Sequence, residues 1–139
     1  IDESIALAAM YAANHLEVRA IGALTETGST PLWMSRISSG IPIYALTAHE
    51  KTCRRVTLFR GVYPISFNPV GIVDHAVLNR AIVEEFMRRG LVDSDDIIIL
   101  TKGDLMGTRG GTNAMKIASI PEVLAAAPDD WKSHCPASQ

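Results

Sequence analysis

Hydroxyl side chains surround a single glycine in residues 25–30, which read Thr-Glu-Thr-Gly-Ser-Thr and are followed by Pro31. Hydroxyls and main-chain N–H groups donate hydrogen bonds to phosphate, and the start of a helix favours an anion by about 0.3–1 kcal/mol. The segment therefore predicts a phosphate site. Its predicted members are Thr25, Glu26, Thr27, Gly28, Ser29 and Thr30. The alternative is structural, with Thr30 capping a helix and the residues before it turning the chain.

A glycine-rich segment, residues 101–113, is a second candidate for ligand binding. It contains four glycines and the cations Lys102 and Arg109. Glycine at this density allows unusual backbone angles and close approach to a ligand, and the cations neutralise anionic groups. The predicted members are Lys102, Gly103, Gly107, Thr108, Arg109, Gly110 and Gly111. A mobile surface loop is the alternative interpretation.

Other common chemistries lack their sequence signatures. The chain has neither the Gly-x-x-x-x-Gly-Lys-Ser/Thr pattern of ATP hydrolysis nor the Gly-x-Gly-x-x-Gly pattern of dinucleotide binding. The four histidines are not spaced as metal ligands, and the Asp74-His75 pair has no Gly-x-Ser-x-Gly nucleophile to serve. We therefore expect no catalytic residue, no metal site and no cofactor in this chain.

Composition narrows the class of protein. The length of 139 residues suits one domain, and 47% of the residues are apolar without any run of 18, so we expect no membrane partner. Thirteen Lys and Arg against fifteen Asp and Glu give a net charge of −2, which argues against nucleic acid, because its binding needs clustered cations. Cys53 and Cys135 lie far apart without metal-type spacing, which favours free thiols and a cytoplasmic location.

A buried strand and the helix after it must hold the predicted phosphate site. Residues 18–25 form a nearly uninterrupted apolar run, which is typical of a strand covered on both faces. Thr30 followed by Pro31 predicts an N-cap and a first helical position, for a helix that ends at about Ser38. The site would then lie where a central strand ends, the usual place for a ligand in an open α/β sheet.

The rest of the chain alternates between strands and helices. Asp2 is expected to cap the first helix. Strands are predicted at residues 43–47, 61–65, 96–101 and 112–120, and helices at residues 3–15, 50–58 and from Asn68-Pro69 to Gly90. The loop between the last two strands is too short for a crossover helix, so these strands should be antiparallel.

This alternation predicts an α/β fold with three layers, α/β/α. The sheet should be mostly parallel and five-stranded, with its last strand antiparallel. Residues 1–120 form the predicted domain, and residues 121–139 a C-terminal extension that is either disordered or adds a turn of helix at residues 122–127.

Three motifs follow one another along the chain. They are Thr-x-x-Gly-Ser-Thr-Pro at residues 25–31, Phe-Arg-Gly-Val-Tyr-Pro at residues 59–64 and Gly-Thr-Arg-Gly-Gly-Thr-Asn at residues 107–113. Their order and spacing over about residues 1–120 resemble the C-terminal, effector-binding domain of bacterial-type pyruvate kinases. The second and third motifs are the more specific ones.

The resemblance implies an α/β domain that packs beside a catalytic (β/α)₈ barrel of the same chain, contributes to a homotetramer and binds an allosteric activator. In that family the segment matching residues 25–30 binds phosphate, and the segment matching about residues 103–111 closes over the effector's sugar. The catalytic lysine and the Mg²⁺ and K⁺ ligands belong to the barrel. The resemblance therefore implies a chain that is inactive alone but belongs to a glycolytic kinase, which transfers a phosphoryl group from phosphoenolpyruvate to ADP.

Glu26 departs from the family pattern, because members that respond to fructose 1,6-bisphosphate often carry a lysine there. Their tryptophan and arginine for the second phosphate have no clear counterpart between Asn68 and Arg80. A carboxylate about 4 Å from a phosphate charge costs roughly 1 kcal/mol in water and nearer 4 at a surface-type effective dielectric. We therefore expect a sugar monophosphate or AMP as the effector, with Glu26 accepting hydrogen bonds from sugar hydroxyls.

Two other interpretations stay open. The chain begins with Ile-Asp-Glu rather than Met, so we expect a piece of a longer protein, but a free-standing phosphometabolite-binding module has the same motifs. A purely structural oligomerisation domain is the other alternative. In that case the small-residue face of the helix at residues 3–15 would form the subunit contact.

Overall fold

The computed structural model describes residues 1–37, 39–69, 72, 74–103 and 112–127. In chain order the elements are α1 (Asp2–His15), β1 (Ala20–Leu24), α2 (Ser29–Ser35), β2 (Ile43–Thr47), α3 (Glu50–Val56), β3 (Val62–Ser66), α4 (His75–Arg88), β4 (Ile97–Gly103), β5 (Thr112–Ser119) and α5 (Ile120–Ala126). None of the helices within these ranges combines the length and the apolar character that crossing a membrane requires.

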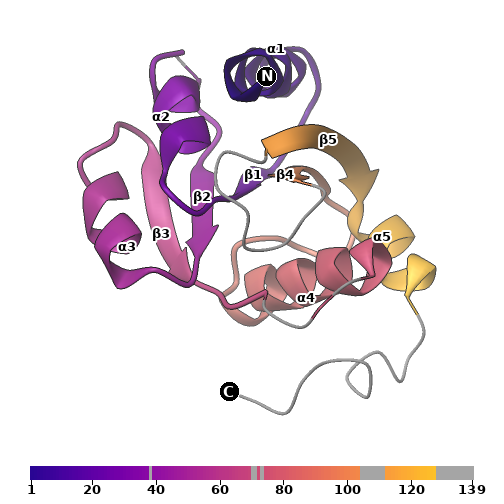
Figure 1. Ribbon diagram of the computed structural model, residues 1–139. Helices are drawn as coiled ribbons and strands as arrows, with labels where there is room; N and C mark the ends of the chain where they lie inside the picture. Colours follow the sequence, from indigo (N-terminus) through magenta and orange to yellow (C-terminus); the bar gives the residue numbers. More distant parts are fainter. Residues whose placement is uncertain (38, 70–71, 73, 104–111, 128–139) are drawn as a thin grey trace.

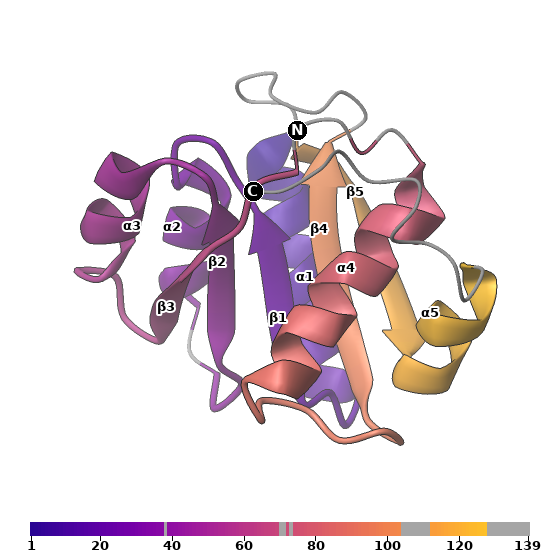
Figure 2. The same cartoon turned by 90° about the horizontal axis from the view of Figure 1, so that it is seen from below.

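A five-stranded sheet in the order β3-β2-β1-β4-β5 forms the centre of the fold. Strands β1 to β4 run parallel, whereas β5 is antiparallel to β4 (Figure 2). Helices cover both faces of the sheet (Figure 1). The predicted three-layer α/β fold is therefore confirmed, and so is the antiparallel last strand.

Each face of the sheet has its own hydrophobic core. On one face Leu100 of β4 belongs to the same cluster as Phe86 of α4. On the other face Ile99 belongs to a cluster with Met34 of α2 and the alanines of α1. Successive strand residues point to opposite faces, which is why neighbouring residues of β4 enter different cores. The central strand β1 is buried by both cores, as its apolar sequence predicts.

The first helix packs closely through small side chains. Ala6, Ala9 and Ala13 are at most 3% exposed, and α1 contacts α2, β4 and β5. The small-residue face that we considered as a subunit contact consists of Ile5, Ala8, Ala9, Ala12 and Ala13. The same chain covers Ala9 and Ala13 of this face, whereas Ala8 is exposed. The outer side of α1 instead carries Leu7 and Tyr11, which are 49% and 67% exposed.

Two predicted helix caps near the N-terminus are wrong. Helix α1 begins at Asp2 itself, with Ile1 as its N-cap. Helix α2 begins at Ser29 after Gly28, whose φ of 88° is left-handed, so Thr30 lies within the first turn and does not cap it. Glycine adopts this backbone conformation at little cost, and α2 therefore starts two residues earlier than predicted, at Ser29 instead of Pro31. The helix ends at Ser35, earlier than the predicted end near Ser38.

Helix α4 also begins later than the Asn68-Pro69 pair predicts. Its N-cap is Asp74, whose carboxylate accepts a hydrogen bond of 2.8 Å from the N–H of Ala76. Pro69 instead lies before the helix, and its carbonyl accepts from the N–H of Ile72 at 3.0 Å. A proline start and an aspartate cap are both typical of helix N-termini, and here the aspartate next to the apolar stripe sets the boundary.

The short helix predicted at residues 122–127 is present as α5 (Ile120–Ala126). It begins with a capping box between Ser119 and Glu122. Ile120 and Val123 are at most 1% exposed and join the core on the α4 side of the sheet. Packing of the described chain therefore continues past residue 120 and includes α5, while residues 128–139 of the predicted extension lie outside the described residues.

Candidate ligand-binding site

The predicted phosphate segment lies at the carboxyl end of the central strand. Strand β1 ends at Leu24, residues 25–28 form a loop, and α2 starts at Ser29. The chain leaves β1 for β2 on one side, and β4 lies on the other side. Such a reversal of strand order at the carboxyl ends opens a crevice in which open α/β sheets bind ligands.

Hydrogen bonds within the loop hold its hydroxyl groups together. The N–H of Gly28 donates to Oγ1 of Thr25 at 2.9 Å, and Oγ1 of Thr27 lies 3.4 Å from Oγ of Ser29. A larger residue at position 28 would be strained, because the φ of 88° is left-handed and an added Cβ would lie 3.1 Å from Cγ1 of Val56. The Thr27 and Ser29 hydroxyls are therefore presented side by side by a turn that needs glycine.

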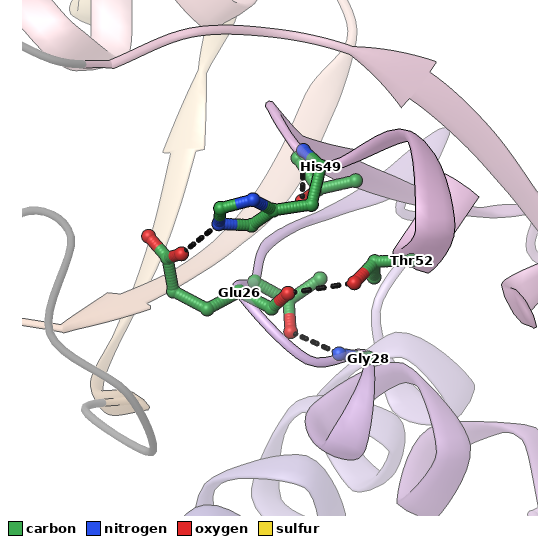
Figure 3. A network of polar contacts seen from close by, with 6 residues as sticks. Glu26, Gly28, His49 and Thr52 are labelled. Carbon is green, nitrogen blue, oxygen red and sulfur yellow. Dashed lines mark hydrogen bonds and ion pairs between the residues drawn. The ribbon is translucent and has the colours of Figure 1, made fainter.

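Helix α3 fixes the same loop from the side (Figure 3). Oγ1 of Thr52 donates to the carbonyl of Glu26 at 2.7 Å, and Nη1 of Arg55 donates to the carbonyl of Thr27 at 3.2 Å. The carboxylate of Glu26 pairs with Nε2 of His49, the N-cap of α3. Three contacts from one helix thus define both the backbone of the loop and the direction of its acidic side chain.

Two buried hydroxyls near this end of the sheet have no hydrogen-bond partner among the described residues. Thr30 in α2 and Thr101 in β4 are each 1% exposed, and within the described residues neither Oγ1 has a hydrogen-bond partner. An unsatisfied buried hydroxyl costs roughly 1–3 kcal/mol. Both residues therefore have hydrogen-bonding capacity that the described protein atoms do not use.

Lys102 lies on β4, the strand next to the one that ends at the loop. Thr101 pairs with Ala23 in the sheet, so Lys102 lies one residue further along, next to Leu24. The side chain points to the α4 face, where its ammonium donates to Oδ1 of Asn79, and the residue is 7% exposed. Burial, together with the nearby charge of Lys116, lowers the pKa of Lys102 to about 8.

Of the remaining members of the predicted glycine-rich site, the structure describes one. Gly103 is the last residue of β4. Gly107, Thr108, Arg109, Gly110 and Gly111 lie outside the described residues.

Within the described part of the chain, no group of three or more His, Cys, Asp or Glu side chains is arranged to hold a metal. Hydroxyls and one buried cation are groups that bind an anion.

Four residues of this site were missed in the sequence, namely His49, Thr52, Arg55 and Asn79. His49, Thr52 and Arg55 contact the loop, whereas Asn79 contacts Lys102. Their contacts with the loop join residues 23 to 28 positions apart, and no local pattern marks such pairs. Asn79 did leave a signal, because an uncharged polar residue inside the buried stripe of α4 needs a partner.

Comparisons with known proteins assign most of the chain to one family. Residues 3–118 match the family model described as pyruvate kinase, alpha/beta domain. The chain is 44% identical over 121 residues to pyruvate kinase II of Salmonella typhimurium, an alignment that covers 86% of this chain and 25% of the relative. It is 41% identical over 121 residues to a pyruvate kinase of Buchnera aphidicola, with the same coverage. The chain thus spans about a quarter of the length of these curated relatives.

Proposed function

Since the chain belongs to the family of pyruvate kinase α/β domains, we propose that it is the regulatory domain of a pyruvate kinase and binds a phosphorylated metabolite at residues 25–30. The whole protein would transfer a phosphoryl group from phosphoenolpyruvate to ADP in the cytoplasm, with its chemistry, Mg²⁺ and K⁺ in a separate barrel domain. This chain would supply regulation and part of a homotetramer interface, and it would be inactive alone.

The observation that carries the proposal is a hydroxyl loop that α3 holds in place, next to a strand that carries a buried cation. The Thr27 and Ser29 hydroxyls lie 3.4 Å apart on a loop that α3 holds at two carbonyl groups. Lys102 lies on the neighbouring strand, and no carboxylate among the described residues pairs with it. A buried lysine without an anionic partner among the described residues is costly, so its presence at this position favours an anionic ligand.

The proposed ligand carries one phosphate, as in a hexose phosphate, a pentose phosphate or AMP. The loop carries one carboxylate, Glu26, which a second phosphate close by would oppose. The imidazole of His49 engages that carboxylate and draws it toward α3. Glu26 can then border the site and accept hydrogen bonds from sugar hydroxyls without meeting the phosphate directly.

Ligand-induced stabilisation tests the proposal. AMP, ribose 5-phosphate, glucose 6-phosphate and fructose 1,6-bisphosphate are each added to the chain, and its thermal midpoint is measured. A ligand at 100 times its Kd stabilises the folded state by about 2.7 kcal/mol. The double variant Thr27→Ala, Ser29→Ala should bind at least about tenfold more weakly, because each lost hydroxyl contact to a charged group is worth about 1.5–3 kcal/mol.

Thr57→Ala is the matched control, since this exposed hydroxyl on the far end of α3 bonds only to the carbonyl of Arg54 among the described residues. It should leave ligand stabilisation unchanged. Equal stabilisation of the parent and the double variant would contradict the assigned loop. Binding of the bisphosphate alone would contradict the monophosphate assignment.

Assembly is a second candidate function, favoured by the outer face of α1. Leu7 and Tyr11 are spaced four residues apart and are 49% and 67% exposed, as in an apolar contact surface. Sedimentation of the parent and of Leu7→Glu separates the two functions, because assembly through α1 requires the variant to shift to a smaller species while it still binds ligand.

A further inference from the structure

Lys102 is the one buried lysine of the described chain, and its surroundings are unusual for a cation. It is 7% exposed, and its ammonium donates to Asn79, which is itself 6% exposed. An amide oxygen orients an ammonium but carries no charge to compensate it. The protein therefore holds a positive charge in a position where burial opposes that charge.

The elements packed around Lys102 add no compensating anion within the described residues. Strand β1 contributes Leu24 beside it, and β5 contributes Lys116, a second cation, in register with Leu100. Helix α4, which crosses this face of the sheet in Figure 2, contributes Asn79.

The charged groups of the surrounding elements are directed elsewhere. On α4, Arg80 bonds to Glu84 and to the carbonyls of residues 124 and 127 at α5. Asp74 accepts from its own helix, and His75 beside it is exposed. Glu26, beyond β1, pairs with His49. A ligand at the neighbouring loop would therefore supply a negative charge that the described residues around Lys102 do not provide.

We propose that ligand binding at residues 25–30 is coupled to protonation of Lys102, so that the site takes up a proton when a phosphate dianion binds. The inference rests on the proposed function and adds a regulatory property to it. An anion near the ammonium favours the charged form of the lysine. By reciprocity, a charged Lys102 favours the bound anion, so the affinity should depend on pH.

The size of the effect follows from where Lys102 titrates. Burial and Lys116 lower the pKa of Lys102 to about 8, so the free protein loses this proton just above neutral pH. If the ligand raises that pKa by about one unit, binding takes up about half a proton at pH 8.5. The same shift predicts up to about tenfold weaker binding at pH 10 than at pH 7.

Calorimetric titration in two buffers measures the proton uptake directly. AMP and glucose 6-phosphate are the probes, because a phosphomonoester with a second pKa of about 6 is already a dianion at pH 8.5 and exchanges no proton of its own. Tris and a buffer of lower ionisation enthalpy give different binding enthalpies if a proton is taken up. The slope of the binding enthalpy against the ionisation enthalpy is the number of protons.

Three variants identify the group that takes up the proton. Lys102→Met should abolish the uptake and weaken binding at pH 7, whereas Lys102→Arg should abolish the uptake but keep a charge at every pH. Arginine is larger in this buried position, so the methionine variant decides if the arginine variant does not fold. Lys116→Met, which alters an exposed lysine, should retain the uptake and move it to higher pH, because it removes a repelling charge.

The outcomes separate this inference from the proposed function. Uptake by the parent that disappears in Lys102→Met supports the coupling. Binding without proton uptake, or uptake that persists in Lys102→Met, overturns the coupling and leaves the loop assignment intact. If neither probe binds between pH 7 and pH 10, both the loop assignment and the coupling are wrong.

Discussion

Replacing Lys102 with methionine should change how the stability of the free protein depends on pH. The pKa of Lys102 falls from its ordinary 10.5 to about 8 in the folded chain, chiefly through burial. Between pH 8 and pH 10.5 the unfolded chain therefore binds more protons at this residue than the folded chain does, and the free energy of unfolding rises with pH. Below pH 8 both states are charged, so this residue contributes no pH dependence there.

The expected gain in the free energy of unfolding follows from the interval between pH 8 and pH 10.5, in which only the unfolded chain keeps this proton. Each pH unit above 8 adds about 1.4 kcal/mol, so the parent should gain about 2 kcal/mol between pH 7 and pH 9.5 relative to Lys102→Met, whose residue 102 does not titrate. Urea denaturation at half-unit pH steps measures the difference. Lys51→Met, which changes an exposed lysine of α3, is the control and should run parallel to the parent. A parent-to-variant difference that stays constant with pH would refute the reasoning.

Two further substitutions test the packing around the site. Gly22→Ala should destabilise the chain by about 1–3 kcal/mol, because its Cβ would lie 2.8 Å from Cδ2 of Leu100 and 3.0 Å from Cζ of Phe86, whereas Gly40→Ala meets no atom within 4 Å and should be nearly neutral in the same denaturation assay. Thr101→Val should leave stability unchanged or raise it by up to about 1 kcal/mol, since it removes a buried hydroxyl without a partner among the described residues. A loss of stability in Thr101→Val would show that this hydroxyl does have a partner.

Much of the fold could be predicted because its cues are local. The apolar run at residues 43–47 became β2 with the predicted bounds, and the short connection after β4 required the antiparallel β5. Helix starts were less predictable where two capping signals compete. Asp74, not Pro69, begins α4, and the left-handed Gly28, not Thr30, precedes α2.

For the candidate site, too, the local features could be predicted from the sequence and the long-range contacts could not. The position of residues 25–30 at the end of a buried strand follows from hydrophobic pattern and turn chemistry, both of which act within a few residues. The partners of Glu26 and Lys102 do not follow from these local patterns. Glu26 lies 23 residues from His49, and Lys102 lies 23 residues from Asn79.

The amino-acid sequence alone determined the order of elements, the glycine turn and the presence of hydroxyls and a lysine near one end of the sheet. Only the tertiary structure decided that Glu26 is held by α3 and that the lysine is buried against α4. These contacts depend on strand register and on how each helix crosses the sheet. Side-chain packing between distant segments sets both, and it sets the dielectric around Lys102 that lowers its pKa.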